Sequence, residues 1–170
     1  LIPRIGATIN EYAFSVVRHF EGSGIPVINH SGAILLARNK FLSLQTLVRR
    51  AIPVPNSYLV INQQGFDQAV ADLGGYPVVA KIPSGRQGKG VVLVRSRADS
   101  AFILGNLQQM THGLVIQEYI PPDKRKDIRA LVVDDQVIGA MELAAQSGDF
   151  RSNVHVTGRG RGLDLNLAWD

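Results

Sequence analysis

A glycine-rich segment supplies the first residue types that could do chemistry. It reads Gly85-Arg86-Gln87-Gly88-Lys89-Gly90. Glycine lets backbone amides approach an anion closely, and Arg86 and Lys89 add positive charge. The segment does not fit a Walker loop, because no Ser or Thr follows Lys89 and the next residues predict a strand. It therefore predicts either a hairpin that covers phosphates or an exposed turn that happens to need glycine.

Two lysines elsewhere favour the phosphate interpretation. Lys81 lies between Ala80 and Ile82 in an apolar stretch just before the glycines. A buried ammonium needs an anionic partner, whereas an edge-strand lysine only discourages aggregation. Lys40 falls in the first turn of a predicted helix, where a cation opposes the helix dipole unless an anion is near. A solvated surface lysine is the alternative for Lys40.

The end of a later apolar strand offers groups that suit an adenine ring. Its residues are Gln117, Glu118, Tyr119 and Ile120, followed by a proline. Backbone groups at such a strand end can bind the edge of the base, and the Glu118 carboxylate could accept from the exocyclic amine. A core strand that ends in an exposed carboxylate is the simpler alternative.

Two further polar groups complete the set of candidates. Asp127 and Arg129 share one face of a predicted strand, where they could bind a ribose hydroxyl and a phosphate or simply pair with each other. In the polar segment Gly148–His155, Arg151 could stabilise a transferring phosphoryl group and Asn153 could help to hold metal or phosphate. A polar loop without such a role is the alternative for this segment.

The elements that must position these residues follow from periodicity and turn residues. We expect a strand at 1–5, a helix that opens with a Thr8–Glu11 capping box, a strand at 25–28 and a linker at about 29–36. The later elements are helices at 38–51 and 66–73, strands at 58–61, 78–82 and 91–95, a helix capped by Ser96 and Asp99, strands at 114–120, 128–133 and 136–144, and an Asp134-Asp135 hairpin turn. This order predicts an α+β fold with antiparallel pairs.

Composition narrows the class of protein. Apolar residues make up 45% and charged residues 19% of 170 residues, which is typical of a globular protein. There is no cysteine, which excludes disulfides and thiolate chemistry and fits a cytoplasmic protein. No apolar run is long enough to span a bilayer. The net charge of +4 suits an anionic substrate, and a nucleic-acid partner is disfavoured because no aromatic residues interleave with the basic ones.

The order of these motifs resembles the RimK-like branch of the ATP-grasp superfamily. The resemblance rests on Ile2-Pro3-Arg4-Ile5-Gly6, Arg38-Asn39-Lys40, Lys81 with the glycine segment, Gln117 to Ile120, Asp127-Ile128-Arg129 and Asp149-Phe150-Arg151-Ser152-Asn153. It implies an ATP-grasp fold at 35–170, with a small lid subdomain at about 52–115. Residues 1–34 would be the end of an α/β pre-ATP-grasp unit.

The resemblance also implies an activity and roles for residues. ATP would phosphorylate a carboxylate, and an amine would attack the acyl phosphate to form an amide. Lys40, Lys81 and the glycine segment would contact phosphates, Glu118 and Tyr119 adenine, and Asp127 the ribose. The reacting phosphate would lie at Arg151, Ser152 and Asn153.

The implied partners are ATP, an amino-acid donor with glutamate favoured, and the C-terminus of a ribosomal protein or a small acceptor. Mg²⁺ or Mn²⁺ would act in the full-length protein, and a homo-oligomer is compatible with the family. The chain departs from the family pattern because it reaches Asp170 without the later metal-binding strand, which suggests a trimmed chain with no metal ligands of its own. A non-catalytic nucleotide-binding fragment or a degenerate homologue is the alternative function.

Overall fold

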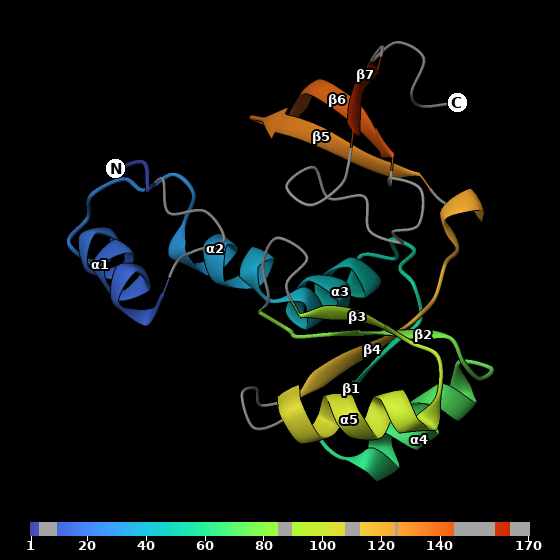
Figure 1. The fold of residues 1–170 in the computed structure, drawn as a ribbon. Coiled ribbons are helices and arrows are strands. Elements are labelled where there is room, and N and C mark those ends of the chain that lie inside the picture. The colour runs from blue at the N-terminus through green and yellow to red at the C-terminus, as the bar shows by residue number, and fades with distance from the viewer. Residues whose placement is uncertain (4–9, 85–89, 108–112, 125, 145–158, 164–170) are drawn as a thin grey trace. The chain divides into compact units, whose positions relative to one another are not determined.

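A computed structural model describes residues 1–3, 10–84, 90–107, 113–124, 126–144 and 159–163 (Figure 1). The chain divides into two compact units. The first comprises Leu1–Arg86 and Gly90–Glu118, and the second comprises Gln87–Lys89 and Tyr119–Asp170. Each unit has its own antiparallel sheet, so each is described by itself.

The first unit opens with the helix α1, Glu11–Gly22. Asn10 caps it, because its side-chain oxygen accepts a hydrogen bond of 2.8 Å from the Ala13 N–H. The predicted capping box with Thr8 as N-cap is therefore wrong, since the cap lies two residues later and Asn is as good a capping residue as Thr. The buried side chains of Val17 and Val27 form a small cluster beneath the helix.

Two expectations for the next segment are also wrong. Residues 25–28 are not a strand. The Ile28 N–H donates to the Leu1 carbonyl at 3.0 Å and the Leu1 ammonium donates to the Pro26 carbonyl at 2.7 Å, but these bonds form no ladder among the described residues. Pro26 has no N–H to give to one. Residues 1–3 are likewise not a strand, and the rest of the predicted strand at 1–5 lies outside the described residues.

The predicted linker at 29–36 is instead mostly the helix α2, Ser31–Arg38. The Ser31 hydroxyl and N–H both donate to the Glu21 carboxylate of α1, which anchors the first turn of α2. The run Ala33-Ile34-Leu35-Leu36-Ala37 then favours a helix.

The helix α3, Lys40–Arg49, confirms the helix predicted at 38–51, with shorter bounds. Asn39 is its N-cap, and its side-chain oxygen accepts from the N–H groups of Phe41 and Leu42 at 3.0 and 3.2 Å. Lys40 therefore does lie in the first turn of the helix.

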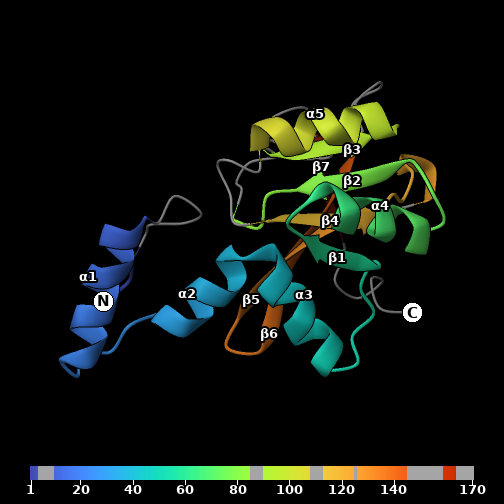
Figure 2. The ribbon, with the colours of Figure 1, turned by 90° about the horizontal axis from the view of Figure 1, so that it is seen from below.

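A four-stranded antiparallel sheet forms the body of the first unit. Its strands are β1 (Ser57–Val60), β2 (Val78–Lys81), β3 (Val91–Val94) and β4 (Leu114–Glu118), in the order β1-β4-β2-β3. Figure 2 shows this order across the sheet. All four strands were predicted within one or two residues at each end. Because β4 and β2 are central, their side chains are covered on both faces, and Val79 and Val115 are as buried as their neighbours.

Two helices cover one face of this sheet. They are α4, Gln63–Asp72, and α5, Arg97–Leu107. In Figure 1 they lie on the opposite side of the sheet from α3. The predicted capping box of α5 is confirmed, since the Asp99 N–H donates to the Ser96 hydroxyl at 3.2 Å and the Ser96 N–H donates to the Asp99 carboxylate at 3.1 Å.

The core under these helices fixes the register of the strands. Phe66 of α4 and Ile103 and Leu104 of α5 pack against Val78, Ala80, Val94, Leu114 and Ile116 of the sheet. Phe102 takes no part in this core, because it is 73% exposed. Spacing alone could not choose between Phe102 and its neighbour Ile103, which is the buried residue.

The second unit is built on a three-stranded antiparallel sheet. After a short 3₁₀ helix, η3 (Pro122–Lys124), it contains β5 (Asp127–Val133), β6 (Gln136–Ala144) and β7 (Arg159–Leu163), in that order. The hairpin turn is confirmed, because Asp134 and Asp135 have φ angles of 48° and 63°. Strand β7 was not predicted, since the alternating glycines of Arg159–Leu163 disfavour a strand.

Both units together confirm an α+β fold with antiparallel sheets. Within the part of the chain that the structure describes, no helix combines the length and the apolar character needed to cross a membrane.

Phe66→Ala is expected to lower the free energy of unfolding by about 3–5 kcal/mol, because it leaves a cavity where the side chain is 0% exposed. Urea denaturation followed by circular dichroism measures this loss. Phe102→Ala is the matched control and should change stability by less than about 0.5 kcal/mol, because Phe102 is 73% exposed. Equal losses in the two variants would contradict the assignment of the core.

Candidate functional site

The stem of the glycine segment is a β-hairpin. Strands β2 and β3 pair in antiparallel register with Lys81 opposite Val91, and the Ile82 N–H donates to the Gly90 carbonyl at 2.8 Å. Gly90 has a φ of 74°, and a Cβ at this position would lie 2.5 Å from Cδ1 of Ile82. Only glycine fits here. The predicted hairpin is therefore confirmed at its stem, while Gly85, Arg86, Gln87 and Gly88 lie outside the described residues.

Lys40 is held against this stem. Its backbone N–H donates to the Pro83 carbonyl at 2.9 Å, and its ammonium donates to the Ile82 carbonyl at 3.1 Å. Burial lowers the pKa of the Lys40 ammonium below its ordinary value. Lys40 is thus a half-buried cation at the base of the glycine segment, and not the solvated surface lysine of the alternative interpretation.

Lys81 is the last residue of β2, and it points to the face of the sheet that α4 and α5 do not cover. Its ammonium donates to the side-chain oxygen of Gln117, which lies on the neighbouring strand β4. Strand β2 is central, so the alternative of an edge-strand lysine is wrong. The sheet therefore brings together Lys81 and Gln117, which the sequence had assigned to separate motifs.

Gln117 continues the hydrogen-bonded chain to β1. Its amide nitrogen donates to the Ser57 hydroxyl at 2.7 Å, and the Ser57 hydroxyl donates to the Pro55 carbonyl at 2.8 Å. Gln117 is only 7% exposed, so these bonds satisfy a buried polar side chain. Sequence reasoning missed Ser57, because it lies 60 residues before Gln117 and only the β1–β4 register places the two opposite each other.

Glu118 is bonded to the segment that precedes β1. Its carboxylate accepts from the backbone N–H of Asn56 at 3.1 Å and from the Asn56 side-chain amide at 3.2 Å. The Glu118 N–H in turn donates to the Asn56 carbonyl at 3.0 Å. The carboxylate is therefore not simply exposed at a strand end, and Asn56 is a second residue of the site that the sequence did not reveal.

The remaining candidates belong to the second unit or lie outside the described residues. Tyr119 and Ile120 follow β4 in no regular element. Asp127 and Arg129 share one face of β5, where they pair in register with Leu143 and Met141 of β6. The candidate residues Arg151, Ser152 and Asn153 lie outside the described residues.

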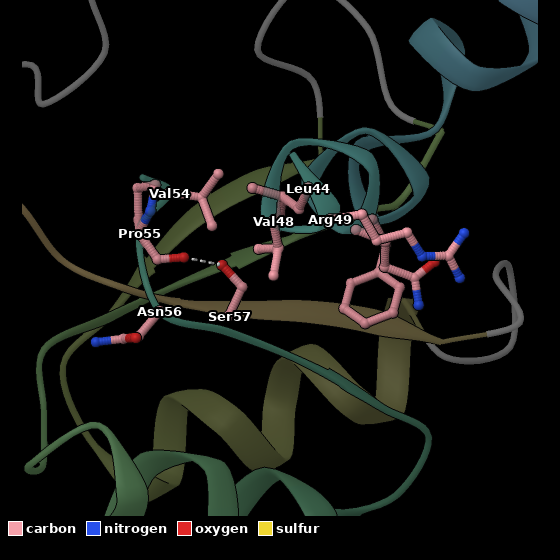
Figure 3. A pocket seen from close by; sticks show the side chains of 9 residues that line it. Leu44, Val48, Arg49, Val54, Pro55, Asn56 and Ser57 are labelled. Atoms are coloured by element: carbon pink, nitrogen blue, oxygen red, sulfur yellow. Dashed lines mark hydrogen bonds between the residues drawn. The ribbon is translucent and has the colours of Figure 1, made fainter. Parts of the chain in front are cut away.

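A cavity of about 370 Å³ lies between α3 and the segment before β1 (Figure 3). Its wall is largely apolar, and it is lined by Phe41, Leu44, Gln45, Val48, Arg49, Val54, Pro55, Asn56 and Ser57. None of the predicted nucleotide-binding residues is among these lining residues. Among the described residues, the cavity touches the candidate site through Asn56, which bonds Glu118, and through Ser57, whose hydroxyl points to the Pro55 carbonyl in Figure 3.

The described residues contain no group of three or more His, Asp or Glu side chains that could hold a metal ion. The cations do suit a polyphosphate, since Lys40 and Lys81 carry positive charge at the stem of the hairpin. Positioned cations of this kind neutralise phosphate charge without a protein nucleophile.

Comparison with known proteins identifies the domains. A family model described as the RimK-like ATP-grasp domain matches residues 37–167, and one described as the RimK PreATP-grasp domain matches residues 1–34. A probable alpha-L-glutamate ligase of Legionella pneumophila (strain Corby) is 38% identical over 159 residues, which are 94% of this chain and 53% of that protein. A ribosomal protein bS6–L-glutamate ligase of Escherichia fergusonii is 39% identical and is matched over 91% of this chain and 52% of its own length.

Solved structures share the fold. The RimK domain ATP-grasp protein of Sphaerobacter thermophilus has a TM-score of 0.67 at 22% identity, over 78% of this chain and 51% of that one. The D-alanine–D-alanine ligase of Bacillus anthracis has a TM-score of 0.66 at 22% identity, over 89% and 50% of the two chains. The present chain spans about half the length of the curated relatives that it matches. From its sequence motifs, its two antiparallel sheets and these matches, the chain belongs to the RimK-like ATP-grasp family.

Proposed function

We propose that the protein carrying this chain is an ATP-dependent carboxylate–amine ligase that forms an amide bond through an acyl-phosphate intermediate. Glutamate is the favoured amino-acid donor, and the acceptor is the C-terminus of a ribosomal protein or a small molecule. Two relatives named glutamate ligases, each 38–39% identical to this chain, support this choice of donor. The observation that carries the proposal is Lys81, a cation on a central strand at the stem of a glycine-rich hairpin.

In this proposal, residues of this chain bind and orient ATP. Lys40 and Lys81 neutralise phosphate charge, and the hairpin at Gly85, Arg86, Gln87 and Gly88 covers the phosphates. The partial burial of Lys40 strengthens its attraction to an anion, because there is less water around it to screen the charge. The cost of burying the ammonium is then recovered when the phosphates arrive.

The base and sugar are assigned to the residues that follow the buried part of β4. Glu118, Tyr119 and Ile120 lie along the adenine, and Asp127 and Arg129 lie at the ribose and a phosphate. Arg151, Ser152 and Asn153 stabilise the γ-phosphate as it moves to the carboxylate. A divalent metal would supply further charge neutralisation.

A ligation assay of the complete protein tests the proposal. With ATP, magnesium, glutamate and a peptide that ends in the acceptor C-terminus, we expect phosphate release and a peptide that is heavier by one or more glutamate residues in mass spectrometry. Phosphate release that depends on another amino acid would show that glutamate is not the donor. Nucleotide binding without phosphate release under any donor would contradict the ligase activity.

Lys81→Met is expected to weaken ATP binding by about 10- to 100-fold, because it removes a charge-assisted bond to phosphate. Isothermal titration calorimetry with ATP and magnesium measures this change, and circular dichroism checks that the domain stays folded. Lys124→Met is the matched control, since Lys124 is an exposed lysine of η3 outside the proposed site. Equal affinity in Lys81→Met and the parent would contradict the phosphate role of Lys81.

Glu118→Ala is expected to weaken ATP and adenosine binding by the same factor, about tenfold, if its carboxylate accepts from the adenine amine. The same substitution breaks both bonds from Asn56, so Asn56→Ala is the control: it removes the side-chain bond to the carboxylate and keeps the carboxylate and its bond from the backbone N–H. Calorimetry with ATP and NMR titration with adenosine give the two affinities. Adenosine binding that is unchanged in Glu118→Ala would contradict the contact between the carboxylate and adenine.

A further inference from the structure

The buried amide of Gln117 lies between a cation and a hydroxyl, and its orientation follows from its neighbours. An ammonium can only donate hydrogen bonds, so the atom of Gln117 that faces Lys81 must be its oxygen. At the other end, the Ser57 hydroxyl uses its one hydrogen for the Pro55 carbonyl at 2.8 Å. Ser57 must therefore accept from Gln117, and the atom of Gln117 that it meets must be the nitrogen, at 2.7 Å.

The contact with Lys81 and the contact with Ser57 therefore require the same orientation of the Gln117 amide. Nothing in this arrangement requires Gln117 to touch a ligand, because its oxygen and nitrogen already have protein partners and its side chain is only 7% exposed. What Gln117 does present to Lys81 is an uncharged acceptor. A neutral oxygen can hold an ammonium in place without cancelling its charge, whereas a carboxylate at this position would form an ion pair that competes with an incoming phosphate.

We infer that Gln117 is a positioning residue that sets the direction of the Lys81 ammonium, and that Ser57 and the Pro55 carbonyl fix Gln117 for this purpose. The inference rests on the proposed function, because it assigns to Lys81 the binding of a polyphosphate. It changes the role of Gln117 from a contact with ATP to a support for the residue that makes that contact. Bonds from Lys81 to phosphate remain compatible with it, since an ammonium has three N–H donors.

The test compares the binding of ATP with the binding of adenosine, which has the same base but no phosphate. Gln117→Leu should weaken ATP binding by about tenfold and leave adenosine binding unchanged, because adenosine has no phosphate for Lys81. Gln117→Glu should weaken ATP binding further, again without an effect on adenosine. Ser57→Ala should have a smaller effect of the same kind. Calorimetry measures ATP binding, and NMR titration measures adenosine binding.

A double-mutant cycle then shows whether Gln117 acts through Lys81. In the Lys81→Met background, Gln117→Leu should cause no further loss of ATP affinity. Gln68→Leu is the matched control, since Gln68 is an exposed glutamine of α4. Thermal unfolding of each variant checks the fold, and Gln117→Glu and Ser57→Ala keep the test decisive if Gln117→Leu does not fold.

The outcomes distinguish the inference from the function on which it rests. Three outcomes would overturn the positioning role while ATP binding by the parent stands. They are equal losses of affinity for ATP and adenosine in the Gln117 variants, no loss of affinity for either ligand, and additive effects of Gln117→Leu and Lys81→Met in the cycle. A parent protein that does not bind ATP would overturn the proposed function, and the role of Gln117 with it.

Discussion

Lys81 lies on a central strand, and its ammonium needs polar partners that the neighbouring strands of the first unit must supply. Strand β2 is bordered by β3 and β4, so the partly buried Lys81 side chain lies over the sheet and not at its edge. A desolvated ammonium costs far more than one hydrogen bond returns unless polar groups surround it. Gln117 supplies such a group from β4, and it is in turn held by Ser57 of β1. A single cation thus links three neighbouring strands.

The two faces of the four-stranded sheet have different roles. The face under α4 and α5 is a closed apolar core whose packing sets the strand register. On the other face the same register places Gln117 opposite both Val79 and Ser57. A shift by one residue would turn Gln117 into the core and an apolar side chain toward Lys81. The position of the polar residues therefore depends on packing that they do not themselves make.

The sequence was informative where local chemistry decides the structure. The capping box at Ser96 and Asp99, the Asp134-Asp135 turn and the apolar strands of both sheets were all predicted from neighbouring residues. The predictions that were wrong, and the residues that were missed, concern features that local chemistry does not decide. Residues 25–28 form no ladder with any other described residues, and α2 is anchored by Glu21, ten residues before Ser31. Asn56 and Ser57 join the site through the pairing of β1 with β4. Interactions between distant residues decide these features, and no local pattern contains them.

The pairing of β1 with β4 has a consequence for folding. Ser57 and Gln117 are separated by 60 residues, and Asn56 and Glu118 by 62. Closing a chain segment of that length costs conformational entropy before the contact can stabilise the fold. Proteins whose contacts join distant residues therefore fold more slowly. We expect the polar bonds around Lys81 to form after the β2–β3 hairpin and the helices α4 and α5, whose contacts are more local. Competence to bind a ligand at Lys81 would consequently appear late during refolding, after most of the helical circular dichroism has returned.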